Sequence, residues 1–240
     1  MSASTLSAAP QYIAEVRNSQ EVTLYGSADL AYWEKKLRPE KLVPVEQNGR
    51  ARLMISAVAS CWLGVKFREF MIAVEVNPKH HTQDVGTSTS LYLLTAYNTS
   101  RPFAFMEQRY FQTPYSYGNV EVQCGSQSSF RLKPRTGEMV HAVRATPPDA
   151  IPKVDEVWDG AIYLPPRPAN ARYPGNLFYA RLGGLTEISP FQPAGDTLQI
   201  TPSPSAPVLS WVWESGFVGS EWHVRHSATH ARSKTYPRDC

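Results

Sequence analysis

The sequence has few cysteines and no pattern that would join them. Cys61, Cys124 and Cys240 are odd in number, widely spaced and include no CxxC pair. This spacing indicates neither a disulfide framework nor a zinc site, and we expect no metal or cofactor. Cys61 lies in the apolar context SCWLG, which predicts a buried rather than a reactive thiol.

Long apolar runs and nucleotide-binding motifs are also missing. No stretch approaches the roughly 18 apolar residues of a membrane helix, and residues 1–10 lack the apolar core of a signal peptide. We therefore expect no membrane partner and a cytoplasmic location. GxSxG, P-loop and GxGxxG patterns are absent. The formal net charge is only +3 and the body of the chain has no basic stripe, which argues against a nucleic-acid partner.

What the chain does have is frequent proline and glycine. Its 240 residues include 20 prolines and 14 glycines, which break up secondary structure. One helix is predicted after Ser27, its expected N-cap, with Asp29 in the first turn and Pro39 as the stop. Elsewhere, short β-branched and aromatic segments alternate with a period of two. The predicted strands are 53–59, 70–76, 90–97, 120–124, 139–144, 158–164, 177–182 and 208–213.

These elements predict a mainly β (α+β) fold. Strands that do not alternate with helices argue against a parallel doubly wound sheet, so we expect an antiparallel, closed or partly open β-barrel with few peripheral helices. Residues 1–224 are expected to form a single domain, since no shift in composition marks a second one. The basic segment 225–240 lacks apolar periodicity and is interpreted as a loosely held, solvated tail.

Three stretches together resemble one enzyme family. They are residues 36–42 (KLRPEKL), 63–69 (LGVKFRE) and 106–115 (MEQRYFQTPY). In this order they are similar to the L-R-x-x-x-P-x-x-L, L-G-x-Y-x-E and G-R-E…Y-P-K-K segments of the acetoacetate decarboxylase superfamily, the first with a shorter spacing. The resemblance covers roughly residues 25–125 and implies that family's barrel and a homo-oligomer.

The chain departs from this family at its central residue. The family uses a lysine whose amine forms a Schiff base with a β-keto acid. The matching positions are Thr113 and Pro114, which cannot form an imine. A second carboxylate of the family falls near Met54 and is absent too. Lys66 is no obvious substitute, because an extended strand that turns Glu69 inward turns Lys66 outward.

Glu69 is the retained position of the family's catalytic set, and the resemblance places it in the active site. We predict that Glu69 moves a proton at a carbon next to a carbonyl and that Tyr115 polarises this carbonyl. If the third stretch is a strand, alternate residues from Arg109 to Tyr117 face the same cavity, and Arg109 binds a substrate carboxylate. The predicted substrate-binding residues are Phe67, Arg109, Thr113 and Tyr117.

Each of these residues also has an ordinary structural explanation. A tyrosine in a β-rich core usually packs with its hydroxyl hydrogen-bonded, and Glu69 can be no more than a paired carboxylate. Two functions therefore stay open. One is a non-decarboxylating enzyme (lyase, isomerase or cyclase) acting on a small carbonyl compound or keto acid. The other is a binding protein that holds such a molecule in the same cavity without chemistry.

Overall fold

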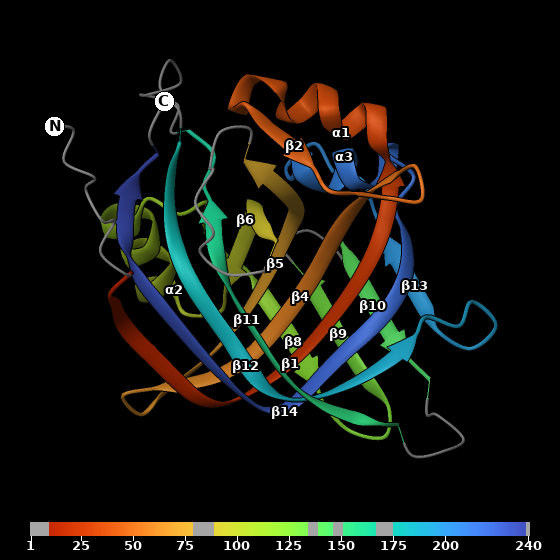
Figure 1. Ribbon diagram of the computed structural model, residues 1–240. Helices are drawn as coiled ribbons and strands as arrows, with labels where there is room; N and C mark the ends of the chain where they lie inside the picture. Colours follow the sequence, from red (N-terminus) through yellow and green to blue (C-terminus); the bar gives the residue numbers. More distant parts are fainter. Residues whose placement is uncertain (1–9, 79–88, 134–138, 146–150, 167–174, 239–240) are drawn as a thin grey trace, which may run out of the picture.

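Long strands close into a ring in the computed structural model, which describes residues 10–78, 89–133, 139–145, 151–166 and 175–238 (Figure 1). β5 pairs with β6 as well as with β4, so the path β5-β4-β1-β14-β12-β11-β6 returns to its start. The pairs are antiparallel, except that β6 runs parallel to β11. The predicted closed β-barrel is confirmed. The ring consists of β1 (Tyr12–Asp29), β4 (Arg50–Trp62), β5 (Val65–Pro78), β6 (Ser90–Asn98), β11 (Lys153–Tyr163), β12 (Asn176–Pro190) and β14 (Val218–Pro237).

A smaller four-stranded sheet, in the order β13-β10-β9-β8, packs against the outside of this ring. Its strands are β8 (Asn119–Gln123), β9 (Ser128–Lys133), β10 (Val140–Arg144) and β13 (Thr197–Ile200). Phe130 on β9 lies 6.0 Å from the ring of Phe70 and 6.1 Å from that of Trp222. All three side chains are fully buried, and each contributes on the order of 2–3 kcal/mol to folding through its apolar area.

The strand β5 shows how the ring separates an apolar outside from a mixed inside. Its even-numbered residues from Phe70 to Val76 belong to the core between the two sheets. Its odd-numbered residues from Glu69 to Glu75 face the interior of the ring, where Ala73 packs with Met54 of β4 and Phe178 of β12. The period-two alternation of a strand thus delivers charged groups to the ring interior.

Three helices lie outside the ring within the described part of the chain: α1 (Leu30–Leu37), α2 (Arg101–Met106) and α3 (Pro207–Glu214). α1 confirms the predicted helix, but Asp29 rather than Ser27 is its N-cap, since its Oδ1 accepts from the backbone N–H of Tyr32 at 2.6 Å. The strand predicted at 208–213 is wrong. Pro207 opens a helix there, and the buried Leu209 and Val212 stand at helical spacing. No described helix is long and apolar enough to cross a membrane.

The interpretation of residues 225–240 as a solvated tail is also wrong. Residues up to Pro237 continue β14, which pairs with β1 on one side and β12 on the other. Arg225 and Ser233 are buried, because the interior of the ring, and not solvent, receives the polar side chains of this strand. Cys61 is exposed instead of buried, since it lies close to the β4–β5 turn.

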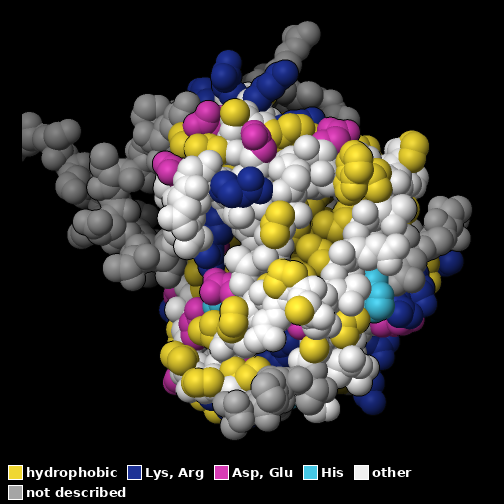
Figure 2. All heavy atoms as spheres, turned by 90° about the vertical axis from the view of Figure 1, so that its right-hand side faces the viewer, with side chains coloured by type: hydrophobic (Ala, Val, Ile, Leu, Met, Phe, Trp, Pro, Cys, Tyr) yellow, Lys and Arg dark blue, Asp and Glu magenta, His cyan; other side chains and the backbone are white. Residues whose placement is uncertain are grey.

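The remaining short elements connect the ring strands. The short strands are β2 (Leu42–Pro44), β3 (Glu46–Gln47) and β7 (Tyr115–Tyr117). A 3₁₀ turn, Arg38–Glu40, follows α1, and a π-helical turn, Glu107–Phe111, follows α2. Seen from the right-hand side of Figure 1, hydrophobic side chains gather near the middle of the surface (Figure 2).

Candidate active site

Glu69 is held at the N-terminal end of β5 by groups from two other segments. Asn98 stands directly opposite it on β6 and donates from Nδ2 to the Glu69 Oε1 at 3.0 Å. The Oδ1 of Asn98 accepts from the backbone N–H of Ser100 at 2.6 Å, which orients this amide. The buried hydroxyl of Tyr115, from β7, also hydrogen-bonds the Glu69 carboxyl. Glu69 is therefore positioned between two hydrogen-bonding side chains.

A second carboxylate, Glu107, is brought to the same place by the π-helical turn after α2. Gln112 ends this turn with a positive φ of 60°, which sends the chain back so that Thr113 reaches Glu107. The Thr113 hydroxyl donates to Glu107 Oε2 at 2.9 Å. Arg232 Nη1, from β14, lies 2.6 Å from both carboxylate oxygens. Glu107 thus accepts charge-assisted hydrogen bonds that fix its position.

Arg232 is enclosed by aromatic rings. Its guanidinium carbon lies 4.4 Å from the ring centre of Phe111 and 4.3 Å from that of Phe178. Two of its donors, Nε and Nη2, are buried and have no hydrogen-bond partner among the described residues. A buried donor without a partner is costly, so Arg232 is the one cation at this site with unused hydrogen-bonding capacity among the groups described here.

The environment of Glu69 raises its pKa to about 7. Burial is the largest cause, since it disfavours the charged form, and the carboxylate of Glu107 adds like-charge repulsion. The hydrogen bonds from Asn98 and Tyr115, together with the charge of His230, act in the opposite direction but do not offset burial. Burial and the nearby carboxylates also hold the pKa of Tyr115 well above its usual value, so its hydroxyl keeps its proton.

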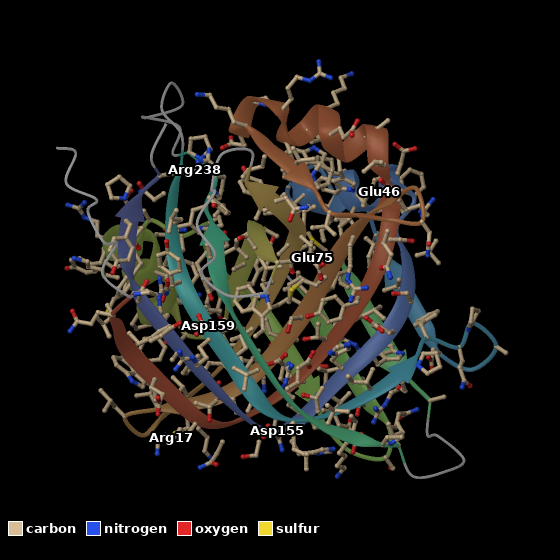
Figure 3. The ribbon with its side chains drawn as sticks, viewed as in Figure 1. Arg17, Glu46, Glu75, Asp155, Asp159 and Arg238 are labelled. Carbon is tan, nitrogen blue, oxygen red and sulfur yellow. The ribbon has the colours of Figure 1, made fainter. Side chains whose placement is uncertain are left out.

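A network of charged groups continues from this site along the ring interior. The Glu21 Oε1 of β1 lies 2.6 Å from Arg225 Nη1, and its Oε2 lies 2.8 Å from His230 Nε2. Burial raises the pKa of Glu21, but Arg225 and His230 outweigh it and the net pKa is lowered. Further along β5, Glu75 pairs with Arg52 Nε at 2.9 Å. Figure 3 labels Glu75 on this strand. Each of these carboxylates has a cationic partner, whereas Glu69 has none at hydrogen-bonding distance in the described structure.

Comparisons with known proteins show which solved structures this fold is similar to. No protein-family model and no curated protein matches the sequence. Among solved structures, acetoacetate decarboxylase from Legionella pneumophila matches with a TM-score of 0.63 and 12% identity over 100% of this chain and 98% of that one. A second acetoacetate decarboxylase structure has a TM-score of 0.62 and 14% identity over 97% and 90% of the two chains. The fold is acetoacetate decarboxylase-like.

Two further neighbours carry other descriptions. An acetoacetate decarboxylase-like enzyme from Sphingomonas wittichii RW1 matches with a TM-score of 0.61 and 9% identity, over 94% of this chain and 92% of that one. The enduracididine biosynthesis enzyme MppR, solved with the condensation product of pyruvate and imidazole 4-carboxaldehyde, has a TM-score of 0.59 and 11% identity over 94% and 88%. The acetoacetate decarboxylase-like fold is thus shared by enzymes with different descriptions.

Within this acetoacetate decarboxylase-like fold, the predicted site residues separate into two groups. Glu69 and Tyr115 are in contact, and Thr113 is buried beside them. Phe67 shares the strand face of Glu69 and lies 5.1 Å from the ring of Phe103. Arg109 is exposed, as is 44% of Tyr117. The expectation that Arg109 and Tyr117 face the cavity together with Thr113 and Tyr115 is wrong.

The reason is the local conformation of this segment. Residues 107–111 form a π-helical turn instead of a strand, so period-two alternation does not apply to Arg109. The residues that sequence reasoning missed are Asn98, Glu107 and Arg232. Glu107 carried a signal, since it lies in the same stretch as Thr113. Arg232 carried none, because its segment was interpreted as a tail.

The exposure of the lysines bears on the expectation that the chain has no Schiff-base lysine. Lys66 is exposed, as expected from strand alternation. No lysine in the described part of the chain is buried, and Lys36 lies against the ring of Trp211 at the α1–α3 surface, 4.2 Å from the ring centre. Lys79 falls outside the described residues. Thr113 lies at the candidate site, where its hydroxyl donates to Glu107.

Proposed function

We infer that this chain is a non-decarboxylating enzyme of acetoacetate decarboxylase-like fold that performs acid–base chemistry on a small carbonyl compound. The observation that carries the proposal is Glu69, a carboxyl group with a pKa of about 7 beside a protonated tyrosine. A general base is most effective when its pKa lies near the working pH, and few carboxyl groups meet this condition. The reaction class is that of a lyase, isomerase or cyclase.

The proposed step is removal of a proton from the carbon next to a carbonyl group. The Glu69 carboxylate takes this proton, and the electron pair of the broken C–H bond moves to the carbonyl oxygen to form an enolate. The Tyr115 hydroxyl exchanges its hydrogen bond with Glu69 for one to the enolate oxygen and so stabilises the developing charge. Return of the proton to another carbon gives an isomer, and loss of a β-substituent gives a lyase product.

Arg232 is the proposed cation of the substrate site, in place of Arg109. Its Nη1 already donates to the Glu107 carboxylate, so the guanidinium binds a carboxylate at this position. Nε and Nη2 are the donors that a substrate carboxylate would use once side chains at the site adjust. This supports a keto acid as the substrate class. Thr113 and Glu107 act through Arg232 by holding it in position.

Chemistry without a Schiff base is part of the proposal. It is supported by Thr113 and Pro114 at the family's lysine positions and by the exposure of Lys66. The alternative, a non-catalytic binding protein, is supported by the full pairing of Glu107 with Arg232 and by the bound small molecule in the neighbour MppR. The cytoplasmic location and homo-oligomeric state remain expectations from the sequence.

The decisive experiment is an NMR assay of 2-keto and 3-keto acids in D₂O. We expect deuterium incorporation or turnover with the wild-type chain and its loss in Glu69→Gln. Glu75→Gln is the matched control, since Glu75 is also a carboxyl on the inward face of β5 and has a raised pKa because of burial. Six residues of strand place it about 20 Å away.

Three outcomes separate the possibilities. Exchange that is lost only in Glu69→Gln supports the enzyme. Line broadening of a keto acid without exchange supports the binding protein and refutes the catalytic proposal for that substrate class. Borohydride treatment in the presence of substrate tests the remaining point, because a reduced covalent adduct would show a Schiff base and contradict the proposed chemistry.

A further inference from the structure

The turn between β4 and β5 places a large apolar residue where the backbone disfavours it. Trp62 and Val65 pair across a two-residue turn in which Leu63 has a φ of 49° and Gly64 a φ of 81°. Such turns favour asparagine or aspartate followed by glycine, since a branched apolar residue is strained at positive φ. Leu63 is also 83% exposed. Neither folding nor packing within the chain explains this residue.

Further apolar side chains surround this turn. Val65 is 47% exposed, and Phe105 on α2 is 61% exposed. α2 lies against the hairpin, because the ring of Phe103 is 5.9 Å from that of Trp62 and 5.1 Å from that of Phe67. The hairpin and α2 therefore lie side by side at the end of the ring that holds Glu69, and each carries exposed apolar side chains.

The same region is positively charged. Lys66 and Arg68 follow the turn on β5, and Arg101 begins α2. All three side chains are exposed, and none forms an ion pair with a carboxylate of the described residues. We call Leu63, Val65, Phe105, Lys66, Arg68 and Arg101 the hairpin-tip surface. It combines exposed apolar groups with cations that have no carboxylate partner among the described residues, although Arg101 lies 4.6 Å from the ring centre of Tyr117.

We propose that the hairpin-tip surface binds the surface of an anionic lipid bilayer. Leu63 and Phe105 enter the boundary between headgroups and acyl chains, and the three cations contact lipid phosphates and carboxylates. A second copy of the chain fits less well, because it would bring the same cations together. A projecting turn with an apolar tip also suits insertion into lipid better than docking to a flat protein face. The proposal departs from the expectation of no membrane partner, which was based on the absence of a long apolar run and did not consider a surface contact.

The test is co-sedimentation of the full chain with vesicles. Phosphatidylcholine vesicles with and without 30% phosphatidylserine are compared at low salt and at about 0.5 M NaCl, where charge attraction is strongly screened. We expect binding to the anionic vesicles only, weakened by salt. Leu63→Asn should lower the partition at least tenfold through the lost apolar burial, while it relieves the strained turn and keeps the fold. Leu185→Asn, at another exposed leucine, is the control and should leave binding unchanged.

Several results would overturn the proposal. Absence of binding to anionic vesicles at low salt refutes it directly, as does equal binding by Leu63→Asn and the wild-type chain. Self-association that disappears in Leu63→Asn, without any vesicle binding, would assign the surface to a second copy. Binding to an acidic polypeptide but not to anionic vesicles would assign it to a protein partner.

Discussion

The raised pKa of Glu69 makes a quantitative prediction about stability. In the unfolded chain this carboxyl has its ordinary pKa of 4.5, whereas in the folded chain the pKa is about 7. Between these two values the folded state binds more protons than the unfolded state, so the free energy of unfolding falls as the pH rises. The loss is complete above about pH 7. A shift of this size corresponds to at most about 3 kcal/mol.

Replacement of Glu69 by glutamine removes this titration. The amide is neutral at every pH and retains the shape of the protonated side chain, so Glu69→Gln should avoid the loss that the wild-type chain suffers. Because Glu69 keeps some contact with solvent, we expect the variant to gain about 2–3 kcal/mol relative to wild type between pH 5 and pH 8. This would be a stabilising substitution at the residue proposed to be catalytic.

The assay is urea unfolding of both chains at several pH values from 5 to 8. The quantity of interest is the difference in unfolding free energy between variant and wild type, since other titrating groups then cancel. Glu34→Gln, an exposed substitution on α1, controls for the removal of one negative charge. If the two stability curves run parallel across this range, Glu69 does not titrate near pH 7 and the basis of the proposed chemistry fails.

Two further predictions concern the Glu107–Arg232 pair and β14. Arg232→Met should destabilise the chain by about 3 kcal/mol because the half-buried Glu107 loses its cationic partner, and the double variant with Glu107→Gln should lose less than the sum of the single losses, by about 1–3 kcal/mol. Chemical unfolding of the four chains measures this, and simple additivity would contradict the pair. Deletion of residues 225–240 should abolish cooperative thermal unfolding, because it opens the ring, whereas deletion of residues 239–240 should not. A folded deletion variant would restore the tail interpretation.

Local patterns were sufficient for much of the fold. Period-two alternation located β4, β5, β6, β8, β10, β11 and β12, and it correctly turned Lys66 away from Glu69. It failed where the local pattern admits two conformations. Residues 208–213 alternate like a strand, but Pro207 and the inward spacing of Leu209 and Val212 suit a helix equally well, and packing against the core decides between them.

The prediction for the segment that forms β14 failed for a different reason. Its partners are β1 and β12, so its register depends on contacts between residues as far apart as Glu21 and Arg225. Its polar residues resemble a solvated tail when the chain is read alone. They are buried because the ring closes around them and supplies carboxylates of opposite charge.

The sequence by itself predicted that the chain is rich in strands, that it resembles a known barrel family and that Glu69 faces the interior of the barrel, whereas the length of the strands emerged only from the structure. Tertiary structure alone decided what surrounds this carboxyl. Asn98, Glu107 and Arg232 come from three segments that no local pattern links. The pKa of Glu69 depends on desolvation, on the charge of Glu107 and on the hydrogen bond from Asn98, and all of these exist only once the ring is closed.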